Sequence, residues 1–417
     1  MASFPEEPLN LSAADGFGYF PADINQTLQE GKYTIVRKLG WGPRSSTWLV
    51  EWEGGERAYW AVQIFTVSAS KSAGTSLLPI LQGPVYGITD SFPAIQDSFW
   101  VPSVHGEHLC LVMAHYGSPL SALLRHATSN GRAGLPIHTV QFTVLAVLRA
   151  LEQLHKVNVM HSGVKLENLA FGSSTNEDEI VNLLSERRSE KAEIIGGFPA
   201  VRSQPLGNYM AEWDDPMHDI VHWFLQLAGF GHVQVPPYTP ESEYNYSSAP
   251  ETLLGNPTCG LSTDVWMLGS LAFELTTGKK LFTSTGPAFE RLGEIRDVLH
   301  DNIPDTWRAD PNVQALPDTD TSVQSLEESL RQVLTEYEAA AMRTRIPSAR
   351  RRARGLKLST RLEQRYSTAR EDRPLHRRRK AALTISQIRN LNSDLLTQVH
   401  LPLINTSRIN THRGLGG

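Results

Sequence analysis

Residues 161–169 read His161-Ser-Gly163-Val-Lys165-Leu-Glu-Asn168-Leu. A predicted helix ends shortly before them, because apolar residues recur at helical spacing from Ile137 to Leu154. Three more short fragments follow: Leu227-Ala-Gly229-Phe230-Gly231, Ala249-Pro250-Glu251 and Asp264-Val-Trp266-Met-Leu-Gly269. Each fragment alone is weak. Their order and spacing together are highly specific and decide the fold.

The region before this loop alternates in the manner of β-strands. We predict strands over residues 33–39, 46–52, 58–64 and 108–113, with a turn at Gly40-Trp-Gly42. Two glycines in a hairpin usually form only a turn, but here Ala-Val-x-Ile follows on the next strand. A glycine-rich hairpin over a cleft lets backbone N–H groups approach phosphates.

These patterns predict an α+β protein in which a small sheet-rich lobe precedes a larger helical lobe. Helices are expected over 68–82, where the signal is weak, and over 137–155, 263–277, 290–300 and 322–342. A cleft between two such lobes is a natural ligand site. The expected organisation is an extended arm (1–31), the first lobe (32–116), the second lobe (117–342) with a polar, poorly periodic insert at about 172–222, and a basic, disordered tail (343–417).

Composition narrows the classes of function. The 417 residues are 40% hydrophobic, a proportion typical of globular proteins. The net charge of −5 argues against a protein that binds nucleic acid over its whole surface. From residue 343 to 380 there are 15 Lys and Arg against 3 acidic residues, a charge of +12, so the remainder carries −17. Two cysteines fit a reducing compartment. We expect no secretory signal and no membrane span, because no uncharged apolar run reaches about 18 residues.

The ordered fragments resemble the eukaryotic protein kinase fold, and within it the SR-protein kinase family, especially its short fungal members. The resemblance covers roughly residues 15–300. The closer match rests on Gly31-Lys-Tyr33, Leu39-Gly-Trp-Gly42, Thr47-Trp48, His108-Leu-Cys-Leu-Val112, Leu254-Gly255 and Gly278-Lys-Lys-Leu-Phe282. It implies a bilobal kinase fold and a serine/threonine kinase ancestry.

Four positions depart from the pattern that the resemblance implies. Gln63 stands where active kinases have the lysine that holds the nucleotide phosphates, and a neutral amide cannot act as a cation. Its pairing glutamate would lie near Leu77, yet no Asp or Glu occurs between Glu56 and Asp90. Gly163 replaces the catalytic-loop aspartate, and Gly229 replaces the aspartate that binds the metal.

Other positions match the family's architecture. Lys165 and Asn168 remain in the loop as its retained polar groups. The resemblance places His161 and Phe230 in a hydrophobic column between the lobes, makes Asp264 the partner of the loop backbone, and makes Glu251 the anchor of the segment after the activation loop. The nucleotide would contact Gly40, Gly42, Ser45, Ala61, Gln63 and Met113, the last at the gatekeeper position.

The losses favour a catalytically impaired pseudokinase that acts as a scaffold or regulator for splicing-type substrates. Phosphoryl transfer depends on positioned charge, and one lost group typically costs on the order of 10²–10³ in rate. ATP would bind weakly if at all, and Mg²⁺ would not be held tightly. The expected partner is a protein, either an active kinase or an Arg/Ser-rich protein; no membrane is implied, and the expected location is the nucleus, the cytoplasm or both.

Two other functions stay open at this stage. One is an active serine/threonine kinase that phosphorylates Arg/Ser-rich proteins by an atypical arrangement, with a carboxylate from Glu177-Asp-Glu179 or Asp214-Asp215 in the insert. The other is a nucleotide sensor that binds ATP without turnover. The basic tail has three readings: nuclear-localisation clusters, attraction to RNA, or a solvated tail.

Several groups also have plain structural readings. Lys165 could be a partly solvated loop lysine, Asn168 could hydrogen-bond within the loop, and Gln63 could be a satisfied amide. His105, His108 and Cys110 have a superficially metal-like spacing, but the other ligands of a tetrahedral site are not evident. We therefore expect no metal site. The aromatic residues Trp48, Trp52, Tyr59 and Trp60 are expected to pack within the first lobe.

Overall fold

The computed structural model describes residues 4–55, 58–83, 91–173, 175–187, 189, 191–206, 211–240, 248–300, 303–319 and 323–332. The chain divides into two units, Met1–Thr321 and Ser322–Gly417. The strands and helices labelled below belong to the first unit. In the second, residues 326–332 are helical, within the helix predicted over 322–342. The predictions for residues 343–417 lie outside the described residues.

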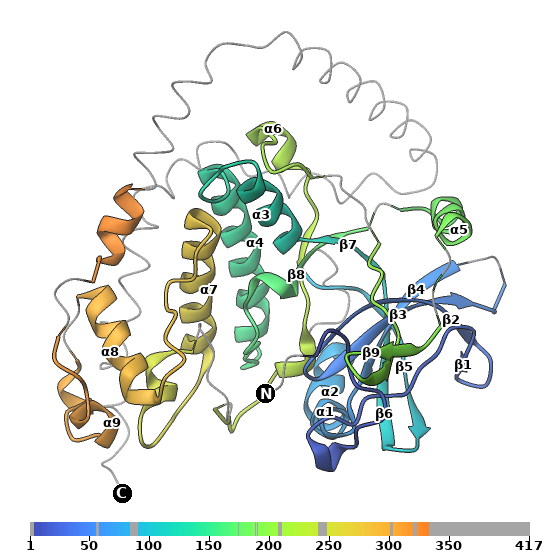
Figure 1. The fold of residues 1–417 in the computed structure, drawn as a ribbon, viewed down its shortest axis with the longest axis horizontal. Helices are drawn as coiled ribbons and strands as arrows, with labels where there is room; N and C mark the ends of the chain where they lie inside the picture. Colours follow the sequence, from blue (N-terminus) through green and yellow to red (C-terminus); the bar gives the residue numbers. More distant parts are fainter. Residues whose placement is uncertain are drawn as a thin grey trace, which may run out of the picture. The chain divides into compact units, whose positions relative to one another are not determined.

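An antiparallel sheet occupies the first part of the chain (Figure 1). Its strands lie in the order β1-β2-β3-β4-β6-β5. The four predicted strands are present as β2, β3, β4 and β6, and the sequence analysis missed β1 and β5. The bounds are β1 Thr27–Leu28, β2 Tyr33–Gly42, β3 Ser45–Trp52, β4 Ala58–Phe65, β5 Ile95–Ser103 and β6 Gly106–Met113.

The turn predicted at Gly40-Trp-Gly42 is wrong. Gly40 and Gly42 lie within β2, where they pair with Thr47 and Ser45 of β3. The two residues between the strands are Pro43 and Arg44, so the turn is two residues long and sits further along the chain. Proline cannot donate a ladder hydrogen bond, which fits its place at the turn.

Each face of the sheet is covered by different segments. One face presents Ile35, Trp48, Val62 and their neighbours, which pack in one cluster with Phe20, Ala22 and Leu28 of the arm and with Val201 of the insert. The arm is therefore a packed layer on the sheet. It contains a short 3₁₀ turn, η1 (Ala13–Asp15), and the strand β1.

The other face joins the sheet to the helices. A helical run made of α1 (Val67–Ser72), the π-helical η2 (Ala73–Leu77) and α2 (Leu78–Gln82) packs beside β4 and β6 and confirms the weak prediction over 68–82. Leu77 is buried in this core. The same cluster continues into the rest of the unit and includes Ala61, Leu111, Met113, Val144, Leu151, Leu227, Leu271 and Leu275.

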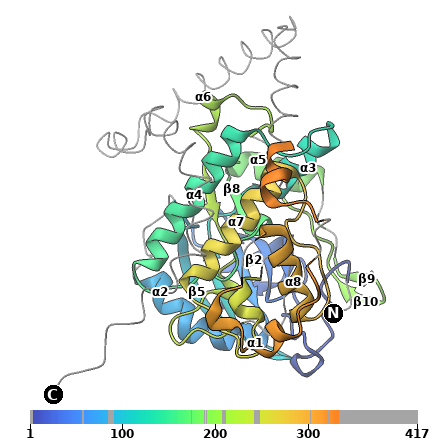
Figure 2. The same ribbon diagram turned by 90° about the vertical axis from the view of Figure 1, so that its left-hand side faces the viewer.

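The long helices behave as their apolar spacing predicts. Helix α4 (Ile137–His155) packs against α7 (Leu261–Thr277), and the two lie side by side in Figures 1 and 2. The α4 positions with a spacing of three or four residues are buried, which removes an apolar stripe from water. Other helices of this unit are α3 (Leu120–Ser129), η3 (Leu166–Asn168), η4 (Phe230–His232), α8 (Ala288–Leu299), η6 (Asp305–Trp307) and α9 (Pro311–Gln314).

A three-stranded sheet in the order β11-β8-β7 lies beside α4. The loop over residues 161–168 leads directly into its strand β8. Its strands are β7 (Tyr116–Pro119), β8 (Leu169–Gly172) and β11 (Leu225–Leu227). The antiparallel sheets and most of the helices are formed by separate segments of this unit, so the predicted α+β class is confirmed. No helix among the described residues is long and apolar enough to cross a lipid bilayer.

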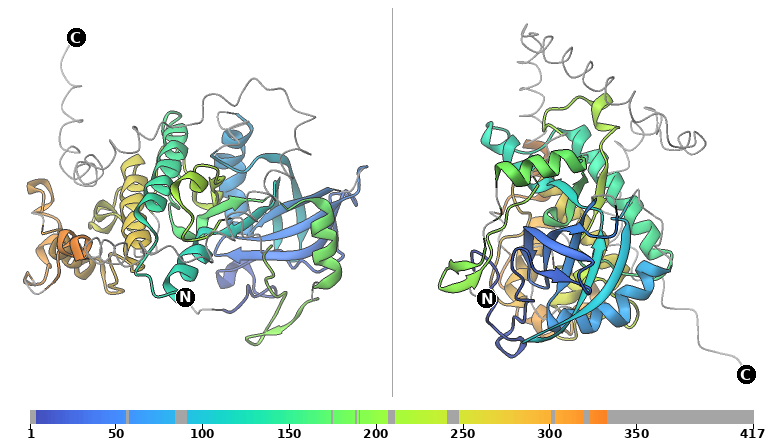
Figure 3. Two further views of the ribbon diagram at one scale, coloured as in Figure 1. Left: turned by 90° about the horizontal axis from the view of Figure 1, so that it is seen from above. Right: turned by 90° about the vertical axis from the view of Figure 1, so that its right-hand side faces the viewer.

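The insert between β8 and β11 is more ordered than the sequence suggests. It contains α5 (Glu177–Glu186), a hairpin of β9 (Glu193–Ile195) and β10 (Phe198–Ala200), and α6 (Met217–Ile220). Helix α5 begins with a capping box between Asn176 and Glu179, a sequence signal that could have revealed it. Ile180 packs on Leu49 and Tyr59 of the sheet, and Figure 3 shows the green helix α5 against the end of the blue strands.

A buried ionic cluster joins the arm, the sheet and the insert. Lys38 on β2 has no exposed surface, and its Nζ donates to Glu6 Oε2 at 2.7 Å, to Glu7 and to the carbonyl oxygen of Val201 at 2.6 Å. Glu6 also accepts from the backbone N–H and the hydroxyl of Ser203, at 2.7 and 2.8 Å. Removing one partner of a buried ion pair typically destabilises a protein by about 3–5 kcal/mol. The cluster therefore holds the arm, β2 and the insert together.

The Glu7 carboxyl should make stability depend on pH. Burial raises the pKa of Glu7 from 4.5 to about 7, although Lys38 lowers it. Because the pKa is higher in the folded state, the favourable contribution is full below 4.5 and is lost as pH rises through about 7. We expect the unfolding free energy to fall between about pH 5 and pH 8, by at most about 3 kcal/mol.

Urea unfolding across this pH range tests the expectation. Glu7→Gln should flatten the fall in stability, whereas Glu53→Gln, which changes an exposed carboxylate, should keep it. An unchanged slope in Glu7→Gln would contradict the assignment.

Candidate functional site

The carboxylate of Asp264 fixes the loop over residues 160–168. Asp264 of α7 is fully buried and accepts hydrogen bonds from the backbone N–H groups of His161 and Ser162, each at 2.7 Å. His155 at the end of α4 lies 2.9 Å from the same carboxylate. Ser162 has a φ of +58°, an uncommon value for a residue with a side chain. These bonds stabilise a tight loop that an isolated chain would not adopt.

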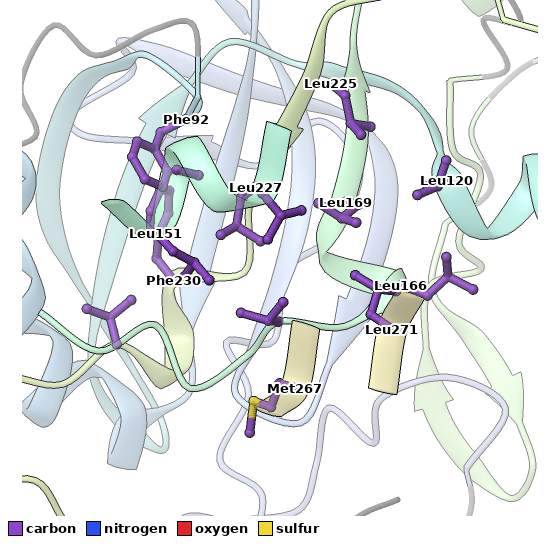
Figure 4. Packing of buried hydrophobic residues seen from close by; sticks show 14 of the residues in the cluster. Phe92, Leu120, Leu151, Leu166, Leu169, Leu225, Leu227, Phe230, Met267 and Leu271 are labelled. Atoms are coloured by element: carbon purple, nitrogen blue, oxygen red, sulfur yellow. The ribbon is translucent and has the colours of Figure 1, made fainter. Parts of the chain in front are cut away.

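His161 and Phe230 lie in an aromatic column. The ring of Phe230 is 6.3 Å from that of His161 and 5.9 Å from that of Phe92. Figure 4 shows Phe92 and Phe230 one above the other, with Leu151 and Leu227 beside them. Burial lowers the pKa of His161 to about 4, so its imidazole is neutral at pH 7. The column is a packing element.

The side-chain amide of Asn168 lies between Gly163 and Gly229. Its Nδ2 donates to the carbonyl oxygen of Gly163 at 2.7 Å, and the backbone carbonyl oxygen of Asn168 accepts from the N–H of Ala228 at 2.8 Å. A β-carbon added at Gly163 would lie 3.0 Å from Asn168 Nδ2, and one added at Gly229 would lie 2.2 Å from Asn168 Cγ. The Asn168 side chain therefore fills space that a side chain at residue 229 would need.

Gly229 also has a backbone that favours glycine. Its φ is +84°, in the left-handed region that L-residues with a β-carbon rarely adopt. An aspartate could not replace it without moving both the backbone and Asn168. The local geometry thus favours glycine at residue 229.

Gln63 lies on β4, an interior strand of the sheet. It pairs with Thr47 and Leu111 in register, and its Nε2 donates to the hydroxyl of Ser45 at 2.8 Å. Leu77, at the place where a partner glutamate was sought, belongs to the apolar core. A neutral amide bonded to a hydroxyl cannot supply positive charge to phosphates.

The glycine hairpin is fastened at its tip. Arg44, in the turn after Gly42, donates from Nη1 to the carbonyl oxygen of Gly231 at 3.1 Å. The hydroxyl of Tyr19, from the arm, donates to the carbonyl oxygen of Gly42 at 2.8 Å. Sequence reasoning missed both residues: Arg44 comes two residues after the quoted Gly40-Trp-Gly42, but no pattern pointed to Tyr19.

Residues expected under a nucleotide base are covered by protein. Ala61 has 0% and Met113 has 1% of its surface exposed, and the two face each other across β4 and β6. The hydroxyl of Tyr116 donates to the sulfur of Met113 at 3.2 Å. A base could reach Ala61 only after protein atoms had moved.

The remaining candidate residues have structural partners. Glu251, in η5 (Pro250–Leu253), accepts from the hydroxyl of Thr263 at 3.0 Å, and burial raises the pKa of Glu251. Lys165 is partly exposed, and its carbonyl oxygen accepts from the N–H of Asn168 at 3.0 Å. His108 places Nδ1 at 2.7 Å from the carbonyl oxygen of Phe65.

Nothing in the described ranges gathers a metal-binding set. Three or more His, Cys, Asp or Glu side chains do not come together there in a way that could hold an ion. The insert carboxylates are used elsewhere: Glu179 caps α5, and Asp215 accepts from the N–H of Glu212 and from the indole of Trp223. The donor set around Asn168 therefore does not fit Mg²⁺, a cation that requires several oxygen ligands.

Two glycines separated by one residue give a sharp test of this packing. Gly229→Ala should destabilise the protein by about 2 kcal/mol, because it forces φ and displaces the Asn168 amide. Gly231→Ala is the matched control, since its β-carbon would meet Arg44 at 3.4 Å and Phe65 at 3.8 Å, which are ordinary contact distances. Urea unfolding measures both, and equal stability of the two variants would contradict the crowding at residue 229.

Comparison with known proteins connects this geometry to a family. No family model matches the chain. A serine/threonine-protein kinase SRPK from Physarum polycephalum is 25% identical over 280 residues, which cover 64% of this chain and 65% of that protein. SRSF protein kinase 3 from Mus musculus is 32% identical over 162 residues, or 36% of this chain and 27% of that protein.

A third relative agrees with the first two. Protein kinase dsk1 from Schizosaccharomyces pombe is 27% identical over 158 residues, or 36% of this chain and 28% of that protein. The chain thus spans less than two thirds of the length of these relatives. These matches confirm the resemblance found in the motifs: the chain is similar to the serine/threonine kinases of the SR-protein kinase family.

Proposed function

We propose that this chain is an SR-protein-kinase-like pseudokinase that works by binding and does not transfer phosphate. Residues 32–116 would form the small lobe and the part from residue 117 the larger lobe of a bilobal kinase-like fold. The observation that carries the proposal is the Asn168 amide, bonded to Gly163 and packed against Gly229. Neither glycine can supply a carboxylate to accept a proton or bind a metal.

The electrostatics of the site support this proposal. Transfer of a phosphoryl group needs cations and metal ions to neutralise the charge that develops. Gln63 is neutral, and both aspartate positions are glycine. Of the acidic residues of the insert that could have substituted, Glu177-Asp-Glu179 and Asp214-Asp215, both Glu179 and Asp215 bond within their own segments. An atypical active arrangement would have to recruit a carboxylate by rearranging these contacts.

ATP would bind weakly, if at all, under this proposal. The covered Ala61 and Met113 leave no exposed surface for an adenine ring, and Arg44 lies across the segment after Gly229. ATP and Mg²⁺ use by the kinase relatives is then an ancestral property that this site has lost.

The partner we propose is a basic protein of the Arg/Ser-rich kind, or an active kinase that handles such a protein. Outside residues 343–380 the chain carries −17, and opposite charge speeds encounter and orients partners. Attraction of RNA to the basic segment and residence in the nucleus or cytoplasm stay predictions, because they depend on residues outside those described.

A phosphorylation assay on an Arg/Ser-repeat peptide tests the proposal. With Mg²⁺ and ATP, we expect phosphate transfer at least about 1,000-fold slower than by an SRPK relative assayed beside it. The same peptide should still bind, with an affinity that falls as salt rises. Mg²⁺-dependent phosphorylation within about a hundredfold of the relative would overturn the proposal and favour the atypical kinase.

A further inference from the structure

The N-terminal arm contacts β2, the strand that leads into the glycine hairpin, at two places. In the middle of β2, Glu6 and Glu7 hold Lys38, and all three are buried. At its end, the hydroxyl of Tyr19 donates to the carbonyl oxygen of Gly42 at 2.8 Å. Tyr19 is only 2% exposed, and its ring lies 6.0 Å from that of Trp41 in an edge-to-face contact.

The arm itself is anchored on three neighbours. The N–H of Leu9 donates to the carbonyl oxygen of Pro199 on β10 at 3.1 Å, and the carbonyl oxygen of Leu9 lies 2.9 Å from the His105 ring. The N–H of Val67, at the start of α1, donates to the carbonyl oxygen of Gly18 at 3.0 Å. A segment fixed at these points can transmit a restraint to Gly42.

The hairpin has three further restraints beyond Gly42. Arg44 donates to the carbonyl oxygen of Gly231, and Gln63 donates to the hydroxyl of Ser45. The backbone carbonyl of Arg44 also accepts from the N–H of Thr66 at 2.9 Å. The hairpin tip is therefore held against Gly231, the last residue of the segment Gly229–Gly231.

We propose that the N-terminal arm acts as a strap, a segment that holds the glycine hairpin closed on Gly229–Gly231. The hydrogen bond from Tyr19 to Gly42 fastens the arm to the hairpin. The hydrogen bond from Arg44 to Gly231 closes the hairpin over the site. The inference rests on the proposed function, because it explains how a site without catalytic charge stays shut. Anything that lifts the arm from Gly42 would free the hairpin. Access to this site would then be regulated from the N-terminal segment.

Amide hydrogen exchange of residues 40–46 in the full chain, followed by mass spectrometry, tests the strap. Tyr19→Phe removes only the bond to Gly42 and should raise exchange of these amides about fivefold, the effect of one lost hydrogen bond. Arg44→Gln should raise exchange of the same amides, because it removes the bond to Gly231. The melting temperature of each variant verifies that it is folded.

Tyr33→Phe is the matched control. Tyr33 is also a buried tyrosine on this sheet, its hydroxyl donates to Asp97 at 3.0 Å, and it lies at the opposite end of β2. It should leave exchange of residues 40–46 unchanged. Wild-type exchange in both Tyr19→Phe and Arg44→Gln, or an equal rise in Tyr33→Phe, would overturn the strap.

The experiment uses no nucleotide and no substrate. Failure of the strap would therefore leave the pseudokinase proposal standing. Robust phosphorylation of a peptide would remove the pseudokinase proposal without altering the exchange result.

Discussion

The buried carboxylate of Asp264 is the contact on which the site depends. It accepts from two consecutive backbone N–H groups, at His161 and Ser162, and fixes a loop with a strained φ. Hydrogen bonds to a carboxylate are stronger inside a protein than the same hydrogen bonds are in water. Once the loop is fixed, Asn168 can reach Gly163, and the segment after β11 can pack against Asn168.

The polar groups of the candidate site bond to one another. Gln63 bonds Ser45, Asn168 bonds Gly163, and Arg44 bonds Gly231. Leaving a buried polar group unpaired costs about 1–3 kcal/mol, so these pairings stabilise the site. Under the proposed function, the same pairings leave these groups unavailable to a nucleotide.

Short-range sequence patterns predicted the strands and helices that depend on short-range spacing of apolar residues. The alternation in β3 and β4 and the apolar spacing of α4 predicted those elements, because each buries one side of a regular structure. The motif fragments also identified Gly163, Gly229 and Asn168 as members of one site. Their mutual packing was not predictable, since it depends on a φ of +84° and on which way one amide turns.

Long-range contacts account for what the sequence analysis missed. The arm reads as polar and punctuated by proline and glycine, yet Tyr19 and Phe20 are buried because the sheet offers an apolar face. Lys38 looks like an ordinary strand lysine until Glu6, Glu7 and Val201 meet it from distant segments. The β2–β3 turn was misplaced because glycine suggested a bend, whereas the strands pair up to Gly42 and Ser45.

The central claim is that this site is closed to a metal-bound nucleotide. A thermal-shift titration of the purified chain with ATP, with and without Mg²⁺, tests it most directly. A ligand at 100 times its Kd stabilises a protein by about 2.7 kcal/mol, which is easily seen as a higher melting temperature. The account predicts no shift in either condition. A shift that requires Mg²⁺ would contradict it, because some carboxylate would then have to hold the metal beside Asn168.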